Sequence, residues 1–340
     1  MKRVAVIGGG FAGANVAKKL QNYCNLTLID TEDFFEYTPG ILRVLVEPEH
    51  YKKLHVRHKE YLKKAKVIVG HVKKVNDKTV LLNNGKEINY DYLVIASGSN
   101  YNSPIKEEDI FFATRVKHLL EAQEKINKSK RIYIVGGGIV GVELVAELAT
   151  HYNDKKISLI HSGDKLLERN STKTQDYATN FLKNRGVEII LNERIIDKNN
   201  KKLKGESGKE YPYDLVFFTV GIKPNISFMN KRFVKKGIIV NNYLQIPEKN
   251  NIFVAGDVSD IVEEKTAQTA EKHANIVSNN ILALINHKKM KEYKSKKGLM
   301  VISLGKYSGI IEYESFVLTG LIPAILKSCI EKMVMSKFKA

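Results

Sequence analysis

Cysteine is scarce in this sequence of 340 residues, which contains only Cys24 and Cys329. There is no Cys-x-x-Cys pair and no Cys/His cluster with metal-ligand spacing, so we expect no zinc, iron–sulfur or dithiol redox site and no metal. A secretory leader and a run of about 20 apolar residues are also lacking. We therefore expect an intracellular protein that does not span a membrane.

Acidic residues are outnumbered, with 37 Asp and Glu against 55 Lys and Arg, which gives a net charge of +18. Such an excess favours an anionic partner, which could be nucleic acid, a lipid surface or nucleotide phosphates. The composition is 43% hydrophobic and 27% charged, which is typical of a globular protein and excludes a disordered chain. The length corresponds to two or three domains.

A sequence pattern at the N-terminus is repeated in the middle of the chain. Residues 2–13 and 130–141 each combine a basic start, a short apolar run and a glycine cluster, and a helical pattern follows. A second apolar run comes after each helix, at 26–29 and at 157–160. Strand, glycine turn, helix and strand form a βαβ unit, so we predict an α/β fold with two similar modules.

Both copies carry the pattern Gly-x-Gly-x-x-Gly between a strand and a helix, which is the context of a dinucleotide site. The first glycine makes the tight turn, the second lets the backbone approach a pyrophosphate, and the third lets helix and strand pack closely. The helix N-terminus favours the phosphates. The predicted cofactor-binding glycines are Gly8, Gly10, Gly13, Gly136, Gly138 and Gly141.

Asp30 ends the second strand of the first copy, where an acid holds a ribose hydroxyl. The second copy has neither an acid nor an arginine at the matching position, although Asp164 lies a few residues further on. The choice between NAD and NADP therefore stays open.

The two motifs, the strand ends Ala96-Ser97-Gly98 and Thr219-Val220-Gly221, and the later Gly256-Asp257 resemble the two-dinucleotide-fold flavoprotein family. The resemblance covers about residues 1–285. It implies two Rossmann-like domains, in which an NAD(P)H domain is inserted into an FAD domain, and a small C-terminal segment with an amphipathic helix. The implied boundaries are 1–110 and 235–290 for the FAD domain, 111–234 for the NAD(P)H domain, and 291–340 for the C-terminal segment.

The resemblance also implies the cofactors FAD and NAD(P)H and further contact residues. Tyr37-Thr38-Pro39 is similar to the Phe-Thr-Pro loop beside the isoalloxazine in type II NADH dehydrogenases. Besides the glycines of the two motifs and Asp30, the implied cofactor-binding residues are Thr38, Pro39, Ser97, Gly98, Gly221, Gly256 and Asp257.

The scarcity of cysteine indicates which branches of this family the sequence does not resemble. Disulfide reductases need a cysteine near the flavin early in the chain, and residues 35–50 contain none. Sulfide:quinone reductases need a pair, whereas we expect Cys24 to be an inert packing thiol and Cys329 to lie in a surface helix. The resemblance is therefore to type II NADH dehydrogenases and to apoptosis-inducing-factor-like NAD(P)H:quinone reductases.

Two residues are candidates for catalysis. Gly141-Val142-Glu143 resembles the Gly-Val-Glu element of type II NADH dehydrogenases, which implies that Glu143 helps to position the nicotinamide. Residues 266–270 are similar to the start of a helix that points at the flavin in that branch, which makes Gln268 a flavin-edge or quinone-site residue. The alternatives are a helix-surface carboxylate for Glu143 and an ordinary polar residue of a helix for Gln268.

The predicted function is that of an FAD-dependent NAD(P)H dehydrogenase. The resemblance implies that hydride passes from NAD(P)H to flavin N5 and that two electrons then pass to a quinone without a cysteine relay. One alternative is a reductase for an acidic protein acceptor such as ferredoxin or rubredoxin. Another is a flavin-containing nucleic-acid-binding protein, although no recognition helix or aromatic-rich basic stripe supports it.

The tail carries a different pattern. From Leu321 apolar residues recur at three- and four-residue spacing with lysines between them, and residues 287–340 hold 11 Lys and 4 Glu. A basic amphipathic helix predicts attachment to an anionic membrane surface. We expect a cytoplasmic protein at the inner face of the cell membrane. The alternative is a docking helix with a solvated lysine face, which would favour a homodimer.

Overall fold

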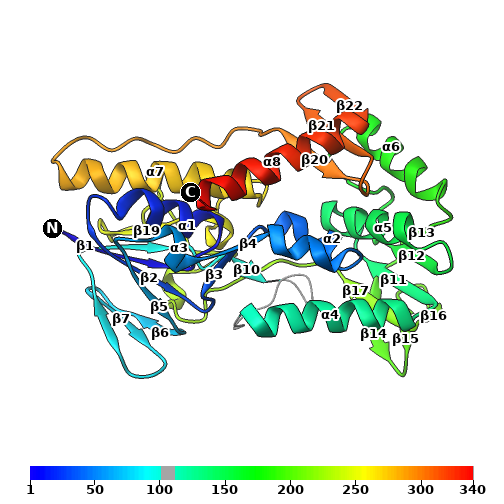
Figure 1. The fold of residues 1–340 in the computed structure, drawn as a ribbon, viewed down its shortest axis with the longest axis horizontal. Helices are drawn as coiled ribbons and strands as arrows, with labels where there is room; N and C mark the ends of the chain where they lie inside the picture. The colour runs from blue at the N-terminus through cyan, green and yellow to red at the C-terminus, as the bar shows by residue number, and fades with distance from the viewer. Residues whose placement is uncertain (101–111, 340) are drawn as a thin grey trace.

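The computed structural model describes residues 1–100 and 112–339, and two parallel sheets form its frame (Figure 1). The first sheet has the order β19-β9-β1-β2-β5. Its strands are β1 (Arg3–Ile7), β2 (Asn25–Asp30), β5 (Lys66–Val69), β9 (Tyr92–Ile95) and β19 (Ile252–Val254). Helix α1 (Phe11–Leu20) joins β1 to β2, and we call the part built on this sheet the first module.

The second sheet has the order β13-β12-β11-β17, and the part built on it is the second module. Its strands are β11 (Arg131–Val135), β12 (Lys156–Ile160), β13 (Glu188–Ile190) and β17 (Leu215–Phe218). Its helices are α4 (Phe112–Lys128), α5 (Ile139–His151) and α6 (Thr172–Lys183). Strand β11 pairs with β12 and β17 in parallel, as β1 pairs with β2 and β9. The predicted repeat and fold class are confirmed.

The chain passes from the first module to the second and back. The outgoing strand β10 (Ser99–Asn100) pairs antiparallel with the returning strand β18 (Lys223–Pro224). Strand β19 then completes the first sheet beside β9, more than 150 positions after β9 in the chain. The second module is thus inserted into the first, as the resemblance implies.

Both modules also contain short helices and strands outside their parallel sheets. In the first are β3 (Phe34–Glu36), β4 (His55–Arg57), β6 (Val72–Val75), β7 (Thr79–Leu82), β8 (Glu87–Asn89), the helices α2 (Ile41–Val44) and α3 (His58–Tyr61), and the 3₁₀ turns η1 (Thr38–Gly40), η2 (Pro48–Lys53), η3 (Lys231–Phe233) and η4 (Gly256–Val258). In the second, β14 (Ile195–Asn199), β15 (Lys202–Gly205) and β16 (Glu210–Pro212) form an antiparallel sheet.

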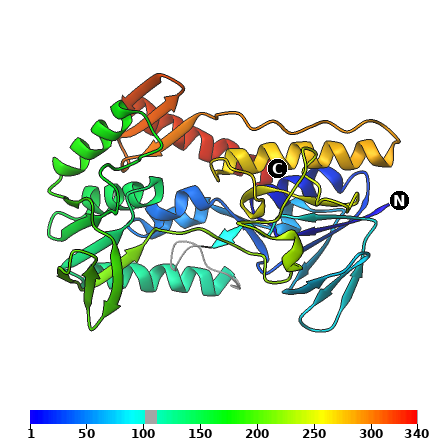
Figure 2. The ribbon, with the colours of Figure 1, turned by 180° about the vertical axis from the view of Figure 1, so that it is seen from behind.

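The C-terminal part connects the two modules. Helix α7 (Ala267–Ile285) packs on α1, and residues 286–299 run back beside α7 (Figures 1 and 2). An antiparallel sheet follows, with β20 (Met300–Ser303), β21 (Gly309–Tyr313) and β22 (Phe316–Gly320). Helix α8 (Leu321–Lys339) packs on that sheet at its start and on α3 and β4 of the first module at its end.

The helix expected in the tail is present as α8, but its apolar residues do not form one face. Leu321, Ile322 and Ile325 are exposed, whereas Val334 and Phe338 are buried. The reason is that the second half of α8 is covered by the first module. Within the described chain, no helix is both long enough and apolar enough to cross a membrane.

Candidate active site

The glycine motifs shape two similar turns. Gly8 and Gly136 leave their strands with φ of +93° and +123°, a conformation that residues with a side chain rarely adopt. A Cβ on the third glycine of each motif would overlap the carbonyl oxygen of the first. These third glycines are Gly13 and Gly141.

Open space lies in front of the same turns. A Cβ on Gly10 or Gly138 would meet no atom within 4 Å, and each of these glycines immediately precedes a helix. A free backbone surface at a helix N-terminus is what a pyrophosphate requires. Gly221, which follows β17 at the edge of the second cradle, is also open at its Cβ position. Both cradles therefore fit a dinucleotide such as FAD or NAD(P)H.

Asp30 lies at the end of β2, beside the first cradle. Its Oδ1 accepts the N–H of Thr31 at 2.8 Å, and its Oδ2 lies 2.9 Å from Nε2 of His58. His58 is fully buried, and its Nδ1 lies 2.7 Å from the hydroxyl of Tyr61. His58 could not be predicted from the sequence, because nothing in its neighbourhood marks it as a partner of Asp30.

In the second module, His161 stands where Asp30 stands in the first. Its Nδ1 accepts the N–H of Gly137 at 3.2 Å, and its Nε2 lies 3.5 Å from the carboxylate of Glu168. Asp164 is exposed. The acid that lies next to the histidine is therefore Glu168 rather than Asp164.

Ser97 and Gly98 lie where the chain leaves the first module. The hydroxyl of Ser97 donates to the carbonyl of Asn225 at 2.7 Å, and the side-chain amide of Asn225 donates back to the carbonyl of Ser97 at 2.9 Å. The backbone N–H of Asn225 donates to the carbonyl of Gly98 at 3.0 Å. The hydroxyl of Ser97 thus ties the two crossing strands together. Buried Ser99, which the sequence analysis missed, donates to the carboxylate of Asp257 at 2.8 Å.

Thr38 and Pro39 form the turn η1, which leads into α2. On α2, Arg43 donates to the carboxylate of Glu147 at 2.8 Å, so this loop is bound to helix α5 of the second module. Burial acts to lower the pKa of Arg43, but the Glu147 carboxylate outweighs it and the pKa is raised. The predicted flavin-side loop and the helix of Glu143 therefore lie together.

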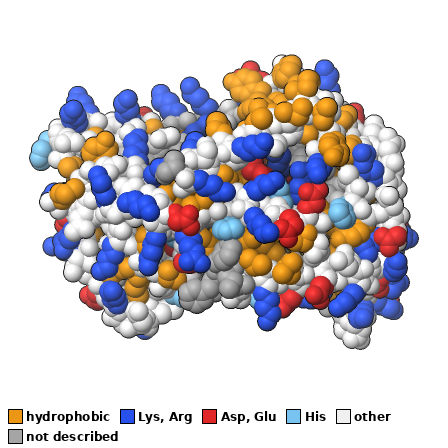
Figure 3. All heavy atoms as spheres, viewed as in Figure 1, with side chains coloured by type: hydrophobic (Ala, Val, Ile, Leu, Met, Phe, Trp, Pro, Cys, Tyr) orange, Lys and Arg blue, Asp and Glu red, His pale blue; other side chains and the backbone are white. Residues whose placement is uncertain are grey.

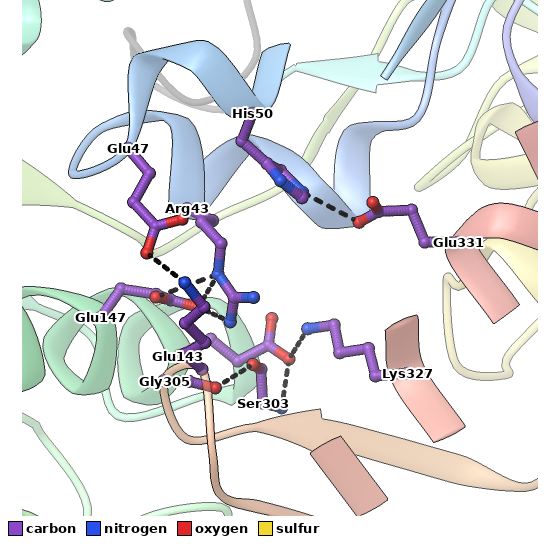
Figure 4. Close-up of polar contacts among 10 residues, drawn as sticks. Arg43, Glu47, His50, Glu143, Glu147, Ser303, Gly305, Lys327 and Glu331 are labelled. Atoms are coloured by element: carbon purple, nitrogen blue, oxygen red, sulfur yellow. Dashed lines mark hydrogen bonds and ion pairs between the residues drawn. The ribbon is translucent and has the colours of Figure 1, made fainter. Parts of the chain in front are cut away.

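Glu143 lies just after the first turn of α5 and is buried, only 7% exposed, so it is not a helix-surface carboxylate (Figure 4). Its Oε1 accepts hydrogen bonds from the ammonium group of Lys327 and from the backbone N–H of Ser303, both at 2.7 Å. Lys327 comes from α8 and Ser303 from β20. Neither partner was predicted from the sequence.

Residues of α5, β20 and α8 meet at this carboxylate, and Figure 4 shows the α2–η2 region beside them, where Arg43 pairs with Glu147. His50 of η2 lies 3.1 Å from the carboxylate of Glu331 on α8. Burial raises the pKa of Tyr37, and the carboxylates of Glu331 and Glu143 raise it further. The cluster is therefore rich in acids, and Lys327 and Arg43 balance them.

Gln268 comes from a further element, helix α7. Thr266 caps α7 by accepting the N–H of Thr269, and Gln268 follows in the first turn with an exposed side chain. Its amide oxygen lies where a Cβ on Gly298 would be. Within the described residues no hydrogen bond joins Gln268 to Glu143. The structure thus brings together Glu143 and the predicted flavin-side loop, and a shared role of Glu143 and Gln268 at the flavin stays a prediction.

The loop of Gly256 and Asp257 forms η4, and buried His273 of α7 contacts it. Nδ1 of His273 accepts the N–H of Gly256 at 3.1 Å, and its Nε2 lies 2.8 Å from Glu263. Both cysteines lie outside the contacts of Glu143. Cys24 is buried below α1, where burial raises the pKa of its thiol, and Cys329 is exposed on α8.

Comparison with known proteins agrees with this geometry. Residues 2–274 match the model of the family described as pyridine nucleotide-disulphide oxidoreductase. Apoptosis-inducing factor homolog B of Dictyostelium discoideum is 34% identical, over 92% of this chain and 89% of its own length. Ferroptosis suppressor protein 1 of Taeniopygia guttata is 30% identical, over 96% of this chain and 92% of its own length.

Among solved structures, NDH2 from Plasmodium falciparum in complex with NADH shares the fold. It superimposes with a TM-score of 0.83 at 14% identity, over 99% of this chain and 97% of the other. The chain belongs to the pyridine nucleotide-disulphide oxidoreductase family, and it is an oxidoreductase that uses FAD and NAD(P)H.

Proposed function

We propose that this protein is an NAD(P)H:quinone reductase that delivers electrons to the quinone without a cysteine relay. The observation that carries the proposal is the ion pair of buried Glu143 with half-buried Lys327, at the junction of both modules and the C-terminal helix. When bound, FAD accepts two electrons from the reduced nicotinamide and supplies them to an acceptor. Reduction of a quinone to a quinol by NAD(P)H takes up one further proton, because the hydride already brings the other hydrogen, and the protein must provide a route for that proton.

In this proposal the first module holds FAD through Gly8, Gly10, Gly13 and Asp30, with Ser97, Gly98, Gly256 and Asp257 at the far end of the site. The second module holds NAD(P)H through Gly136, Gly138, Gly141 and Gly221. Thr38 and Pro39 line the flavin side, and Gln268 lies at its edge. We propose domain boundaries of 1–110 with 235–290, 111–234, and 291–340.

Glu143 and Lys327 have two proposed tasks. Glu143 orients the nicotinamide from the N-terminal half of α5, and the ammonium group of Lys327 donates a proton to the reduced acceptor. The side chain of Lys327 is 21% exposed and that of Glu143 is 9% exposed, so the lysine can exchange protons with water while the carboxylate stays dry. Positioned proton donors of this kind accelerate reactions by about 10²–10⁴-fold.

The surface above this pair favours a lipid-soluble acceptor. Figure 3 shows apolar side chains gathered over β20–β22 and the start of α8, with Lys and Arg spread over the rest of that face. Phe316 is 58% exposed and Ile322 is 62% exposed. We propose that this patch binds the anionic lipids at the inner face of the cell membrane. The other exposed apolar residues of these elements are Tyr313, Leu321 and Ile325.

Flotation with vesicles of phosphatidylcholine and phosphatidylglycerol tests this attachment. We expect the protein to float at low salt and the pair Phe316→Ser and Ile322→Ser to abolish flotation. Val262→Ser is the matched control, because Val262 is 98% exposed but lies before α7, outside β20–β22 and α8. Unchanged flotation of the double variant would contradict the membrane role. If light scattering shows a dimer, and the double variant is a monomer, the patch is instead the contact with a second copy of the chain.

The competing activity is reduction of an acidic protein such as ferredoxin, which the net charge of +18 favours. The decisive experiment follows oxidation of NADH and NADPH by the yellow holoprotein with a short-chain quinone or with ferredoxin. We expect quinone-dependent turnover that Glu143→Gln slows strongly and Glu314→Gln, an exposed control, leaves unchanged. Turnover with ferredoxin alone would contradict the proposal.

A further inference from the structure

The last turn of α8 reaches the wall behind the first dinucleotide cradle. Phe338 is fully buried there, with its ring centroid 4.3 Å from that of Phe35 and 4.9 Å from that of Tyr61. The ammonium group of Lys18 lies 5.6 Å from the centre of the Phe338 ring and covers it from the α1 side. The C-terminal helix thus supplies part of the core of the first module.

A chain of contacts leads from Phe338 to Asp30. The hydroxyl of Tyr61 lies 2.7 Å from Nδ1 of His58, and Nε2 of His58 lies 2.9 Å from Oδ2 of Asp30. A neutral imidazole satisfies both contacts, because the tyrosine hydroxyl donates to Nδ1 and the Nε2–H donates to the carboxylate. Burial also raises the pKa of Tyr61 well above its usual value, so the phenol keeps the proton that it donates.

These contacts fix the direction of the Asp30 carboxylate. Oδ1 accepts the N–H of Thr31 and Oδ2 accepts from His58, so the carboxylate plane cannot rotate. Each carboxylate oxygen has two lone pairs, and one on each oxygen remains for hydroxyl donors outside. A carboxylate held in this way can receive a pair of ribose hydroxyls without first losing rotational freedom.

The same helix touches the opposite end of the site. Lys327 and Phe338 are 11 residues apart on α8, which corresponds to about 16 Å along the helix axis. Lys327 holds Glu143 at the junction of the modules, whereas Phe338 packs on Tyr61, which reaches Asp30 through His58. One helix therefore spans from the proposed reaction centre to the proposed adenosine end of the FAD site.

We propose that His58 is a positioning residue that holds Asp30 ready for the adenosine ribose of FAD, and that Phe338 keeps this pair dry. The end of the C-terminal helix then controls how tightly FAD is held. This inference rests on the proposed role of Asp30 as an FAD contact.

The test measures the rate of FAD release from the purified holoprotein, followed by the rise of flavin fluorescence after dilution. We expect His58→Leu to speed release by about 10- to 100-fold, since a hydrogen bond to a charged group is lost. His58→Gln keeps an N–H donor and should restore slow release in part. Phe338→Ala should speed release as well, whereas Met333→Ala, an exposed control on the same helix, should not.

A double-mutant comparison separates this route from general loosening of the fold. If Phe338 acts through Asp30, then Phe338→Ala should add little to the faster release of Asp30→Asn. Fully additive effects would overturn the inference but leave Asp30 as an FAD contact. No effect of Asp30→Asn would overturn the proposed FAD site and the inference together. Phe338→Leu, which keeps an apolar side chain, replaces Phe338→Ala if the latter does not fold, and the same comparison applies to it.

Discussion

The ammonium nitrogen of Lys327 lies 2.7 Å from the carboxylate of Glu143, although 184 positions separate the two residues in the chain. Glu143 lies in the N-terminal half of the helix that carries the second glycine motif, and Lys327 belongs to the C-terminal helix. The contact ties the proposed nicotinamide site to the segment that carries the exposed apolar patch. It makes the C-terminal helix part of the proposed reaction centre.

We predict that Lys327→Met slows quinone reduction by about 100-fold, because a positioned proton donor is removed. Lys327→Arg should keep the ion pair but still be slow, since arginine does not release its proton near neutral pH. Steady-state rates at saturating NADH and their dependence on pH measure this effect. Lys332→Met, which changes an exposed lysine of the same helix, is the control. A fully active Lys327→Arg variant would rule out proton donation and leave only a structural role.

The pair of Arg43 and Glu147 predicts a loss of stability. It joins α2 to α5 at 2.8 Å with side-chain exposures of 20% and 7%. Arg43→Met should lower the unfolding free energy by about 3 kcal/mol, because it leaves the Glu147 carboxylate buried and unpaired. Urea denaturation measures the change. Arg3→Met breaks the exposed pair with Asp91 and should cost much less, because solvent and salt screen an exposed pair. Equal losses in the two variants would contradict a special role for the buried pair.

The parts of the site that depend on neighbouring residues could be predicted from the sequence. The glycine turns after β1 and β11 follow from a local pattern, because strand, turn and helix are close in the chain. The antiparallel pairing of β10 and β18 and the contact of Ser99 with Asp257 could not be predicted in this way. They join residues far apart, and a serine has no pattern that names its partner.

The tail shows the same division. Its helix was predicted from periodicity and is confirmed as α8. Periodicity reports only how residues face one another on a single helix, so it does not distinguish Lys327 from the other lysines of the tail. The structure instead directs Lys327 to Glu143 and pairs Lys337 with Glu271 at 3.3 Å. Only the packing of α8 across both modules decides which lysines are solvated.

The cysteines provide a test of the direct route to the acceptor. Cys24 is buried with a raised pKa, and Cys329 is exposed on α8. We predict that Cys24→Ala combined with Cys329→Ser keeps quinone turnover within about twofold and loses roughly 1 kcal/mol of stability. Iodoacetamide should likewise leave the rate of the unsubstituted protein unchanged. A turnover that collapses in the variant without unfolding would show that a thiol takes part.

His273 predicts how stability depends on pH. It is fully buried, and desolvation lowers its pKa. The carboxylates of Glu263, at 2.8 Å, and of Asp257 act to raise the pKa, and Lys265 acts to lower it, but desolvation has the largest effect. The unfolded histidine has a pKa near 6.5. Below about pH 6.5 the unfolded chain therefore binds a proton that the native histidine does not bind, and the native state loses stability.

The loss should reach up to about 1.4 kcal/mol per pH unit until the native histidine is protonated as well, and it should vanish above about pH 7. His273→Gln removes this titration, so its unfolding free energy should fall less than that of the unsubstituted protein between pH 7.5 and 5.5. Urea denaturation of the holoprotein at both pH values gives the comparison, with His151→Gln, an exposed histidine, as the control. If His273→Gln and the unsubstituted protein lose the same stability over this range, then other groups cause the loss of stability at low pH and the buried histidine does not.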